Sequence, residues 1–275
     1  MKVVLFILLL LAALIAVVLI RTLTLKETSA KTAKIKLDTS ARADEYAQTL
    51  AKMIRKETIS DRYNDDRTKF YEFHELLEEL FPNIHNVCEK HVFDGSLLFK
   101  WSGKGNHDPI LFMSHHDVVE ANGEWEHAPF SGDIDENGNV WGRGTVDTKA
   151  SLFCELTAVE ELIKEGYVPE CDVYIASSCT EEISGQGAPM TVQYLKEQGV
   201  KLAYLMDEGG MILEEPVGGV KGIYGVVGVL EKGYGDVKFT AHGTGGHASA
   251  LGKNTLLVRL GKFMVDVEKH NPFKK

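Results

Sequence analysis

Histidine and acidic side chains follow several of the chain's apolar runs. His115 and Asp117 end the run PILFMSHHDVV, Glu181 and Glu182 follow CDVYIASSCT, and Asp207 follows LAYLM. Strand side chains alternate with a period of two, so His115 and Asp117 would lie on one face of a strand. Imidazole and carboxylate groups are ligands that zinc accepts, and carboxylates can bridge two metal ions in hydrolases. The spacing therefore indicates a metal site, provided that the fold brings these residues together.

One more carboxylate, Asp147, stands in WGRGTVDTKA, directly before a helical pattern. Taken singly, each signal also has a plainer reading: His-x-Asp as a hydrogen-bonded pair, the two glutamates as a solvated turn, and Asp207 as a loop acid. In a metal site, adjacent Glu181 and Glu182 can divide two tasks. One can coordinate the metal, and the other can take a proton from metal-bound water and pass it to a leaving amine.

The elements that must position these residues follow an α/β pattern. Apolar residues at helical spacing in ADEYAQTLAKMIRKETI and TKFYEFHELLEELF predict two helices before the first strand. Short apolar runs then alternate with helical stretches, one of which ends at the capping glycine Gly166. This alternation predicts a mostly parallel sheet with helices on both faces. In such sheets, functional residues collect at the carboxyl ends of the strands.

The bulk composition is that of a globular protein with an acidic surface. The 275 residues are 44% hydrophobic and 25% charged, and the formal net charge is −10. Nucleic-acid binding needs a basic surface, so we expect no nucleic-acid partner. The four cysteines form no C-x-x-C pair, which argues against a thiolate zinc site and a disulfide-dense scaffold. We expect buried free thiols, with one disulfide left open if the chain is exported.

The N-terminal segment Val3–Ile20 is an uninterrupted apolar run flanked by Lys2 and Arg21. Its length matches the ~17–25 residues that cross a bilayer and exceeds the ~7–15 residues of a signal-peptide core. No small-x-small cleavage site follows it. We expect residues 1–21 to form a membrane anchor that places the rest of the chain outside the cytoplasm. Secretion after signal cleavage is the alternative.

Three further segments follow this N-terminal run. Residues 22–40 are polar and rich in Lys and Thr, as in a tether. Residues 41–228 carry the α/β pattern. From about Val226 the sequence becomes glycine-rich with alternating apolar residues, and NTLLVRLGKFMVDVEKH then has helical spacing. Residues 229–275 are therefore predicted to begin a second unit with a strand, a loop and a helix, too few elements to close a domain.

Six motifs occur in an order that resembles a known enzyme family: SHHDVV, W-x(3)-PFSG, NGNVWGRGTVDTKAS, TEEISGQGA, DEGG and GTGGHAS. They resemble the dizinc metallopeptidases that include aminoacylase, carboxypeptidase G and succinyl-diaminopimelate desuccinylase. GRGTVDTK, EEISGQGA and VLEKGYGDV are most similar to the carboxypeptidase S, or Gly-X carboxypeptidase, branch, which includes secreted N-acyl amino acid hydrolases. The resemblance extends from about Ala41 to the end of the chain. It implies a zinc-peptidase catalytic domain over residues 41–228 and the start of a lid or dimerisation domain over residues 229–275.

The resemblance also implies metal ligands. His115 and Asp207 would bind one zinc ion, Glu182 would bind the other, and Asp147 would bridge both. The last zinc ligand of the family is a histidine beyond the lid domain, and no residue before Lys275 matches it. We therefore expect the chain to be incomplete within the lid and largely inactive by itself.

The catalytic roles are implied in the same way. Glu181 would be the general base, and Asp117 would hydrogen-bond the ligand histidine and fix its tautomer. His247, in GGHAS, would reach the active site of a partner subunit and stabilise the developing oxyanion, so a homodimer through the lid is implied. His116 occupies a variable position of the family. Arg143 is expected to support its loop through a salt bridge.

These patterns predict a hydrolase with two zinc ions that cleaves an amide bond next to a free carboxylate in small peptides. One alternative is an N-acyl amino acid hydrolase or synthase of the same family. Another is a catalytically dead, membrane-tethered binding protein that keeps the fold.

Overall fold

The computed structural model describes residues 2–24, 41–215, 221–230, 233, 235, 237–243 and 252–270. Its internal contacts divide the chain into two units, Met1–Glu208 and Gly209–Lys275, and each unit is described by itself. The boundary that the sequence predicts, between residues 228 and 229, lies further along the chain and stays a prediction.

The first helix is long and apolar enough to cross a membrane. Helix α1 spans Lys2–Thr24, and its 21-residue stretch Val4–Thr24 contains an 18-residue window with a mean hydropathy of 3.1. At 1.5 Å per residue, this stretch is about as long as the ~30 Å hydrocarbon core of a bilayer. The hydroxyls of Thr22 and Thr24 donate to the carbonyls of Val18 and Ile20, so they add no unpaired polar group at the end of the helix.

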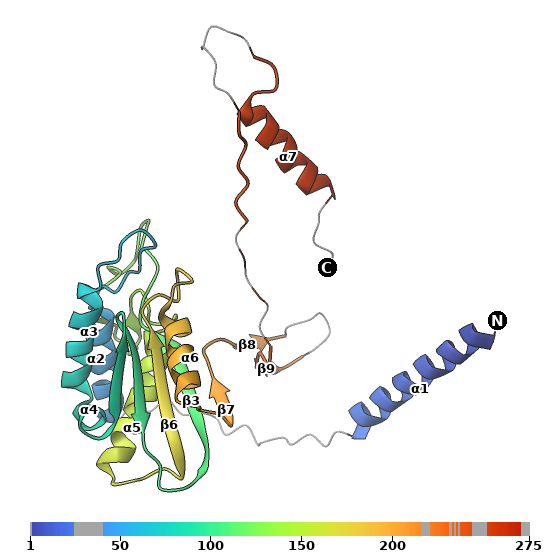
Figure 1. The fold of residues 1–275 in the computed structure, drawn as a ribbon. Helices are drawn as coiled ribbons and strands as arrows, with labels where there is room; N and C mark the ends of the chain where they lie inside the picture. Colours follow the sequence, from blue (N-terminus) through green and yellow to red (C-terminus); the bar gives the residue numbers. More distant parts are fainter. Residues whose placement is uncertain are drawn as a thin grey trace. The chain divides into compact units, whose positions relative to one another are not determined.

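Five strands form the main sheet, in the order β1-β2-β6-β3-β7 (Figure 1). They are β1 (Glu89–Phe93), β2 (Ser96–Trp101), β3 (His107–His115), β6 (Cys171–Ser178) and β7 (Tyr204–Met206). Strands β6, β3 and β7 run parallel, whereas the β1–β2 hairpin pairs antiparallel to β6. The predicted α/β class is confirmed, and the hairpin makes the sheet mixed. Asp94 and Gly95 turn the hairpin with φ angles of 47° and 90°, which suits the left-handed geometry of a two-residue turn.

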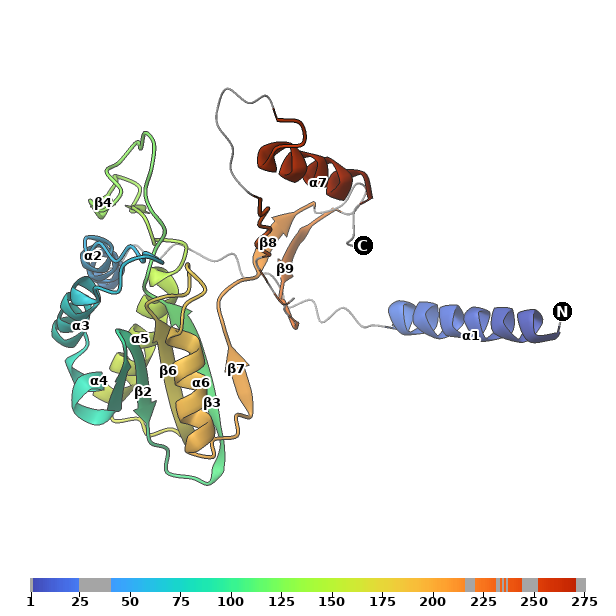
Figure 2. The same ribbon diagram turned by 45° about the horizontal axis from the view of Figure 1, so that its top comes forward.

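Helices cover both faces of the sheet, as the sequence predicts (Figure 2). One face packs against α2 (Ala41–Ile54), α3 (Thr68–Leu80), α4 (Pro82–Val87) and α5 (Lys149–Lys164). The other face packs against α6 (Gly187–Glu197). Fully buried Phe73, Leu77, Leu152 and Leu156 occupy the first layer because they recur at helical spacing on α3 and α5.

A small hairpin and the second unit complete the described elements. The hairpin consists of β4 (Asp133–Ile134) and β5 (Val140–Trp141). In the second unit, β8 (Met211–Glu214) pairs antiparallel with β9 (Ile223–Val226), and α7 spans Leu256–His270. The predicted helix is confirmed. The predicted strand after Val226 is not: among the described residues of 227–243 none is in a strand, and β9 ends where that strand was expected to begin.

Candidate metal centre

The three parallel strands end at one edge of the sheet, and the candidate ligands follow them there. His115 is the last residue of β3, Glu181 follows β6 by three residues, and β7 ends at Met206. His115 pairs in register with Ser178 at the end of β6. This edge is where side chains from separate strands of an α/β sheet converge.

His115 is the centre of the cluster and is almost fully buried, with 1% of its surface exposed. Its Nδ1 lies 3.0 Å from the backbone oxygen of Asp117. Its Nε2 points to carboxylates, 3.0 Å from Oδ1 of Asp147 and 3.3 Å from Oε1 of Glu208. Glu181 Oε2 lies 3.8 Å from the same nitrogen. One ring nitrogen is therefore held by the backbone, and the other is directed at a group of acids.

Asp117 links His115 to the pair of glutamates. Its carboxylate is fully buried, with Oδ1 3.4 Å from Nδ1 of His115. The same Oδ1 accepts the N–H of Glu181 and Oδ2 accepts the N–H of Glu182, each at 3.1 Å. A single side chain thus sets the orientation of the imidazole and the backbone of both glutamates.

Among the residues that the structure describes, two groups of side chains have ligand atoms within 4.8 Å of one another. One consists of His115, Asp147 and Glu182, and the other of His115, Glu181 and Glu208. The structure therefore brings together four residues named from the sequence, and their roles as ligands or base stay predictions. A histidine with three or four carboxylates is a donor set that zinc accepts, so the residues present fit a divalent metal ion.

Glu208 is the member of the cluster that the sequence reasoning did not name. Asp207 was predicted as the ligand after β7, but its Oδ1 accepts the N–H of Glu208 at 2.8 Å. The strand ends at Met206, so the period-two rule that would select one of the two acids no longer applies at this point. Two adjacent acids after a strand make either residue a candidate metal ligand. The predicted role of Asp207 is not tested here, and Glu208 is an alternative ligand at the same strand end.

Asp147 approaches the cluster from the loop before α5. The peptide bond between Asp147 and Thr148 is cis, and the Asp147 side chain is 69% exposed. Gly142 and Gly144 allow the loop to turn because their φ angles are 146° and 87°. A Cβ at Gly144 would lie 2.9 Å from the Val118 side chain, so the loop passes close to the residue that follows Asp117.

The electrostatics of the cluster favour positive charge at its centre. Burial opposes the imidazolium, but hydrogen bonds to the carboxylates of Asp117 and Glu208 raise the pKa of His115 to about 11. Burial and then neighbouring acids raise the pKa of Glu182, and burial is also the main cause of the raised pKa of Glu181. The hydrogen bond with His115 lowers the pKa of Glu208. Carboxylates crowded in this way are stabilised by a cation between them.

Burial is the main cause of unusual pKa values at other groups near the site. Burial raises the pKa of Glu155 on α5 to about 7, although its Oε2 accepts a hydrogen bond from Ser114 Oγ at 2.8 Å. His116 is completely buried between Ser177 Oγ and the carbonyl of Gly95, and burial lowers its pKa well below the usual value. His116 therefore packs in the core on the face opposite His115, in agreement with the sequence analysis, which gave it no role.

Three further expectations meet different outcomes. Arg143 was expected in a salt bridge, but among the described residues its guanidinium lies 4.9 Å from the centre of the Trp125 ring and donates to the Glu120 carbonyl. It supports the loop through an aromatic ring and a backbone oxygen, so the salt-bridge expectation is wrong. His247 lies outside the described residues. All four cysteines are free thiols, as expected, but the expected burial holds only for Cys88 and Cys179, since Cys154 is exposed and Cys171 is half-buried.

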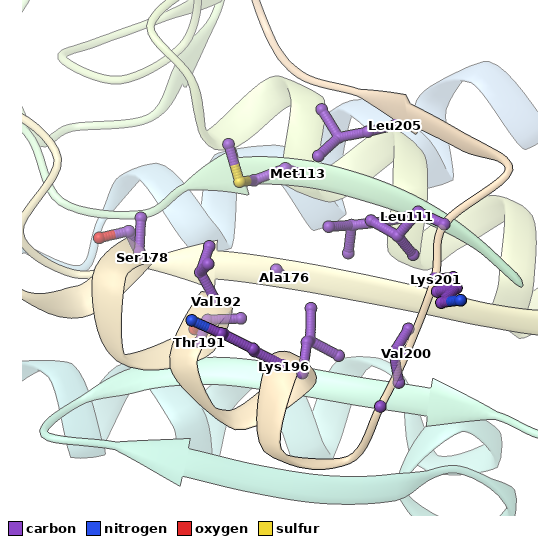
Figure 3. A pocket seen from close by; sticks show the side chains of 14 residues that line it. Leu111, Met113, Ala176, Ser178, Thr191, Val192, Lys196, Val200, Lys201 and Leu205 are labelled. Carbon is purple, nitrogen blue, oxygen red and sulfur yellow. The ribbon is translucent and has the colours of Figure 1, made fainter.

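An apolar cavity of about 670 Å³ lies on the α6 face of the sheet (Figure 3). Leu111 and Met113 of β3, Ala176 of β6 and Leu205 of β7 line it opposite Leu195 of α6. No residue of the two ligand groups lines this cavity. The candidate centre is therefore identified by its donor atoms and not by this cavity.

Comparisons with known proteins agree with this arrangement. Residues 111–273 match the family model of peptidase family M20/M25/M40. The chain is 33% identical over 242 residues to probable carboxypeptidase S-like 2 of Dictyostelium discoideum, covering 84% of the chain and 46% of that relative. It is 36% identical over 250 residues to the N-fatty-acyl-amino acid synthase/hydrolase PM20D1 of Xenopus tropicalis, covering 87% of the chain and 49% of that relative. The chain thus spans about half the length of these curated relatives.

One solved structure shows the same fold. It is an M20 family metallo-carboxypeptidase, Sso-CP2, from Sulfolobus solfataricus, with a TM-score of 0.51 and 21% identity. The match covers 62% of this chain and 40% of that structure.

Proposed function

The chain belongs to peptidase family M20/M25/M40, and we propose that it builds the zinc site of a hydrolase that cleaves the amide bond next to a free carboxylate in small peptides. The observation that carries this proposal is the buried Asp117 carboxylate, which holds His115 on one side and the Glu181 and Glu182 amides on the other. In metal-bound histidines, the ring nitrogen that does not bind the metal regularly donates a hydrogen bond to such a carboxylate.

The proposed chemistry divides the acids of the cluster by position. When bound, zinc lowers the pKa of a coordinated water and polarises the scissile carbonyl. His115, Asp147 and Glu182 are the proposed ligands, with Asp207 or its neighbour Glu208 completing the set. Asp117 keeps the proton of the His115 ring on Nδ1, so that Nε2 is free to donate its lone pair.

Glu181 is the proposed general base. Its backbone is fixed by Asp117, and its carboxylate lies at the edge of the cluster with about half of its surface exposed. A carboxylate with a raised pKa accepts a proton from water more readily than an ordinary glutamate. The same carboxyl group then delivers this proton to the leaving amine nitrogen, which restores Glu181 for the next cycle.

A second candidate function uses the same site on a different substrate. One relative is named an N-fatty-acyl-amino acid synthase/hydrolase, and an N-acyl amino acid also has an amide next to a free carboxylate. The chemistry of the metal centre is the same for both substrate classes, so the pocket around the acyl or amino-terminal side must discriminate between them.

A substrate panel tests both candidates. The full chain in detergent with zinc would be assayed on dipeptides, on N-fatty-acyl amino acids, and on the matching amides in which the carboxylate is methylated. Because this chain is expected to be largely inactive by itself, we expect weak hydrolysis of one of the first two classes, at least tenfold faster than of the methylated compounds, and loss of this activity in Glu181→Gln. Equal rates on the methylated compounds, or activity that persists after chelation, would contradict the proposal. Zinc-dependent binding without turnover would favour the tethered binding protein.

The location and assembly of the protein are also proposals. The hydropathy and length of α1 support a membrane anchor with the catalytic unit outside the cytoplasm, and a cleaved signal is the alternative. We also propose that the second unit contributes to a homodimer. The exposed apolar side chains of α7, Leu257 at 82% and Met264 at 69%, support this role.

A further inference from the structure

Lys149 is a charged residue in the core with no exposed surface. Its Nζ donates to the carbonyls of Met53, at 3.2 Å, and Lys56, at 2.6 Å. Nζ also lies 5.1 Å from the centre of the Phe73 ring. Burial lowers the pKa of Lys149 to about 7, and the two carbonyls and the ring are the contacts that favour its ammonium form.

One acceptor of Lys149, Met53, is in the last turn of α2, where carbonyls lack partners within the helix, and the other, Lys56, lies two residues beyond the helix. A helix C-terminus has partial negative charge, so an ammonium group is favourable at this position. Lys149 therefore caps a helix that is about 93 residues away in the sequence.

The segment that follows this cap is bonded to the strand end that carries His115. Val118 N donates to Thr58 O at 3.0 Å, and Ser60 N donates to Val118 O at 3.2 Å. Thr58 Oγ1 also donates to the carbonyl of His116. The segment that follows Lys56 is thus hydrogen-bonded to the backbone on either side of Asp117.

Lys149 itself belongs to the loop that carries Asp147. It is the first residue of α5, two residues after Asp147, and its N–H donates to Gly144 O at 2.9 Å. A Cβ at Gly144 would lie 3.4 Å from Cδ of Lys149, so the loop closes around the stem of the lysine. The ammonium group lies at one end of this stem and the Asp147 loop at the other.

We infer that Lys149 is a positioning residue of the metal centre, because it ties the loop of Asp147 to the segment that holds His115 and Asp117. This inference rests on the proposed function, which requires these residues to share a metal ion. Lys149 touches none of the proposed ligands, and it acts through the backbone of both segments. Ligands on separate segments must be held within about 0.5 Å of their productive geometry, so a change in this tie should alter the metal site.

The test is Lys149→Met in the full chain in detergent, with Co²⁺ as the metal probe. Methionine keeps the unbranched apolar stem and removes the ammonium group. We expect roughly tenfold weaker Co²⁺ binding, as for other residues that orient ligands from behind. We also expect a changed visible absorption of the bound Co²⁺, because its intensity and position report the coordination geometry.

Leu156→Ala is the matched control. Leu156 lies on the same helix and is fully buried, but its side chain has no polar group and forms no hydrogen bond to the Asp147 loop or to the α2 carbonyls. Its truncation should lower the Tm and leave the Co²⁺ affinity and spectrum unchanged. If Lys149→Met lowers the Tm in the same way with unchanged affinity and spectrum, Lys149 is merely structural and the inference is wrong.

Two further variants keep the outcome decisive. If Lys149→Met does not fold, Thr58→Val removes the next link, the bond to the His116 carbonyl, and should change the Co²⁺ affinity and spectrum in the same direction. Unchanged Co²⁺ binding in Thr58→Val would then overturn the inference. Loss of Co²⁺ in His115→Ala with normal binding in Lys149→Met would contradict the positioning role alone. A chain that binds no Co²⁺ at all would contradict the proposed function itself.

Discussion

Replacement of Asp117 by asparagine should disturb the centre without changing the size of the side chain. Both carboxylate oxygens accept a backbone N–H, from Glu181 and from Glu182, and the group is fully buried. An asparagine has only one acceptor oxygen, so its NH₂ group must face one of these two donors. The variant therefore loses one charge-assisted hydrogen bond and leaves a buried N–H without an acceptor.

The expected loss of stability follows from these contacts. A hydrogen bond to a charged group contributes about 1.5–3 kcal/mol, and an unsatisfied buried donor costs a similar amount. We expect Asp117→Asn to lower the free energy of unfolding by about 2–3 kcal/mol, which for a unit of this size lowers the Tm by about 4–12 °C. Zinc affinity should also fall by roughly 10–100-fold, because the imidazole of His115 loses the carboxylate that orients it.

Thermal unfolding in EDTA and zinc titration would measure the two effects separately. Asp133→Asn is the matched control, because the Asp133 side chain is 51% exposed and forms an ion pair with His127 at 3.1 Å. Exposed substitutions of this kind usually change stability by less than about 0.5 kcal/mol. If Asp117→Asn unfolds at the same temperature as the control and binds zinc normally, Asp117 does not have the role argued here.

Three further outcomes are expected. Glu181→Gln should lower turnover by roughly 10²–10⁴ while zinc per chain is unchanged, and loss of zinc with normal turnover per metal would exchange the roles of Glu181 and Glu182. Glu155 has a pKa raised to about 7 by burial, so the folded metal-free chain holds a proton that the unfolded chain releases above its ordinary pKa near 4.5. The stability that this raised pKa contributes is present below pH 4.5 and is lost as the pH rises to about 7. In urea unfolding, the free energy of unfolding should therefore decline by on the order of 2–3 kcal/mol between these pH values, and Glu155→Gln should remove this decline. An identical pH profile in the variant would exclude this assignment. The full chain should stay with membranes through alkaline carbonate extraction because of α1, whereas release of a shortened chain would indicate signal cleavage.

The elements of the fold could be predicted where the apolar pattern was long and regular. The helices over Ala41–Ile54 and Thr68–Leu80 and the strands that end at His115 and Ser178 all have such patterns. The Asp94–Gly95 pair is a hairpin signal for β1 and β2 that the sequence analysis did not use. The antiparallel pairing of this hairpin with β6 could not be predicted, because a pattern of apolar residues does not encode which strand lies beside which.

Most residues of the site could be predicted from the sequence, whereas their arrangement in space could be predicted only in part. His115, Asp147, Glu181 and Glu182 converge because parallel strands end at one edge, which the sequence could indicate. The approach of Glu208 depends on where β7 ends, and that is decided by packing. The burial of Lys149 could not be predicted, because a lysine at the start of a helix is usually exposed to solvent.

Zinc content in His115→Ala tests the central claim most directly, because His115 belongs to both ligand groups. The full chain would be loaded with zinc, passed through a desalting column, and analysed for metal per chain by elemental analysis. His127→Ala is the control, since His127 pairs with Asp133 outside the cluster. We predict that the unaltered chain and the His127 variant retain zinc and that the His115 variant retains almost none. Equal zinc in all three would contradict a metal centre built on His115.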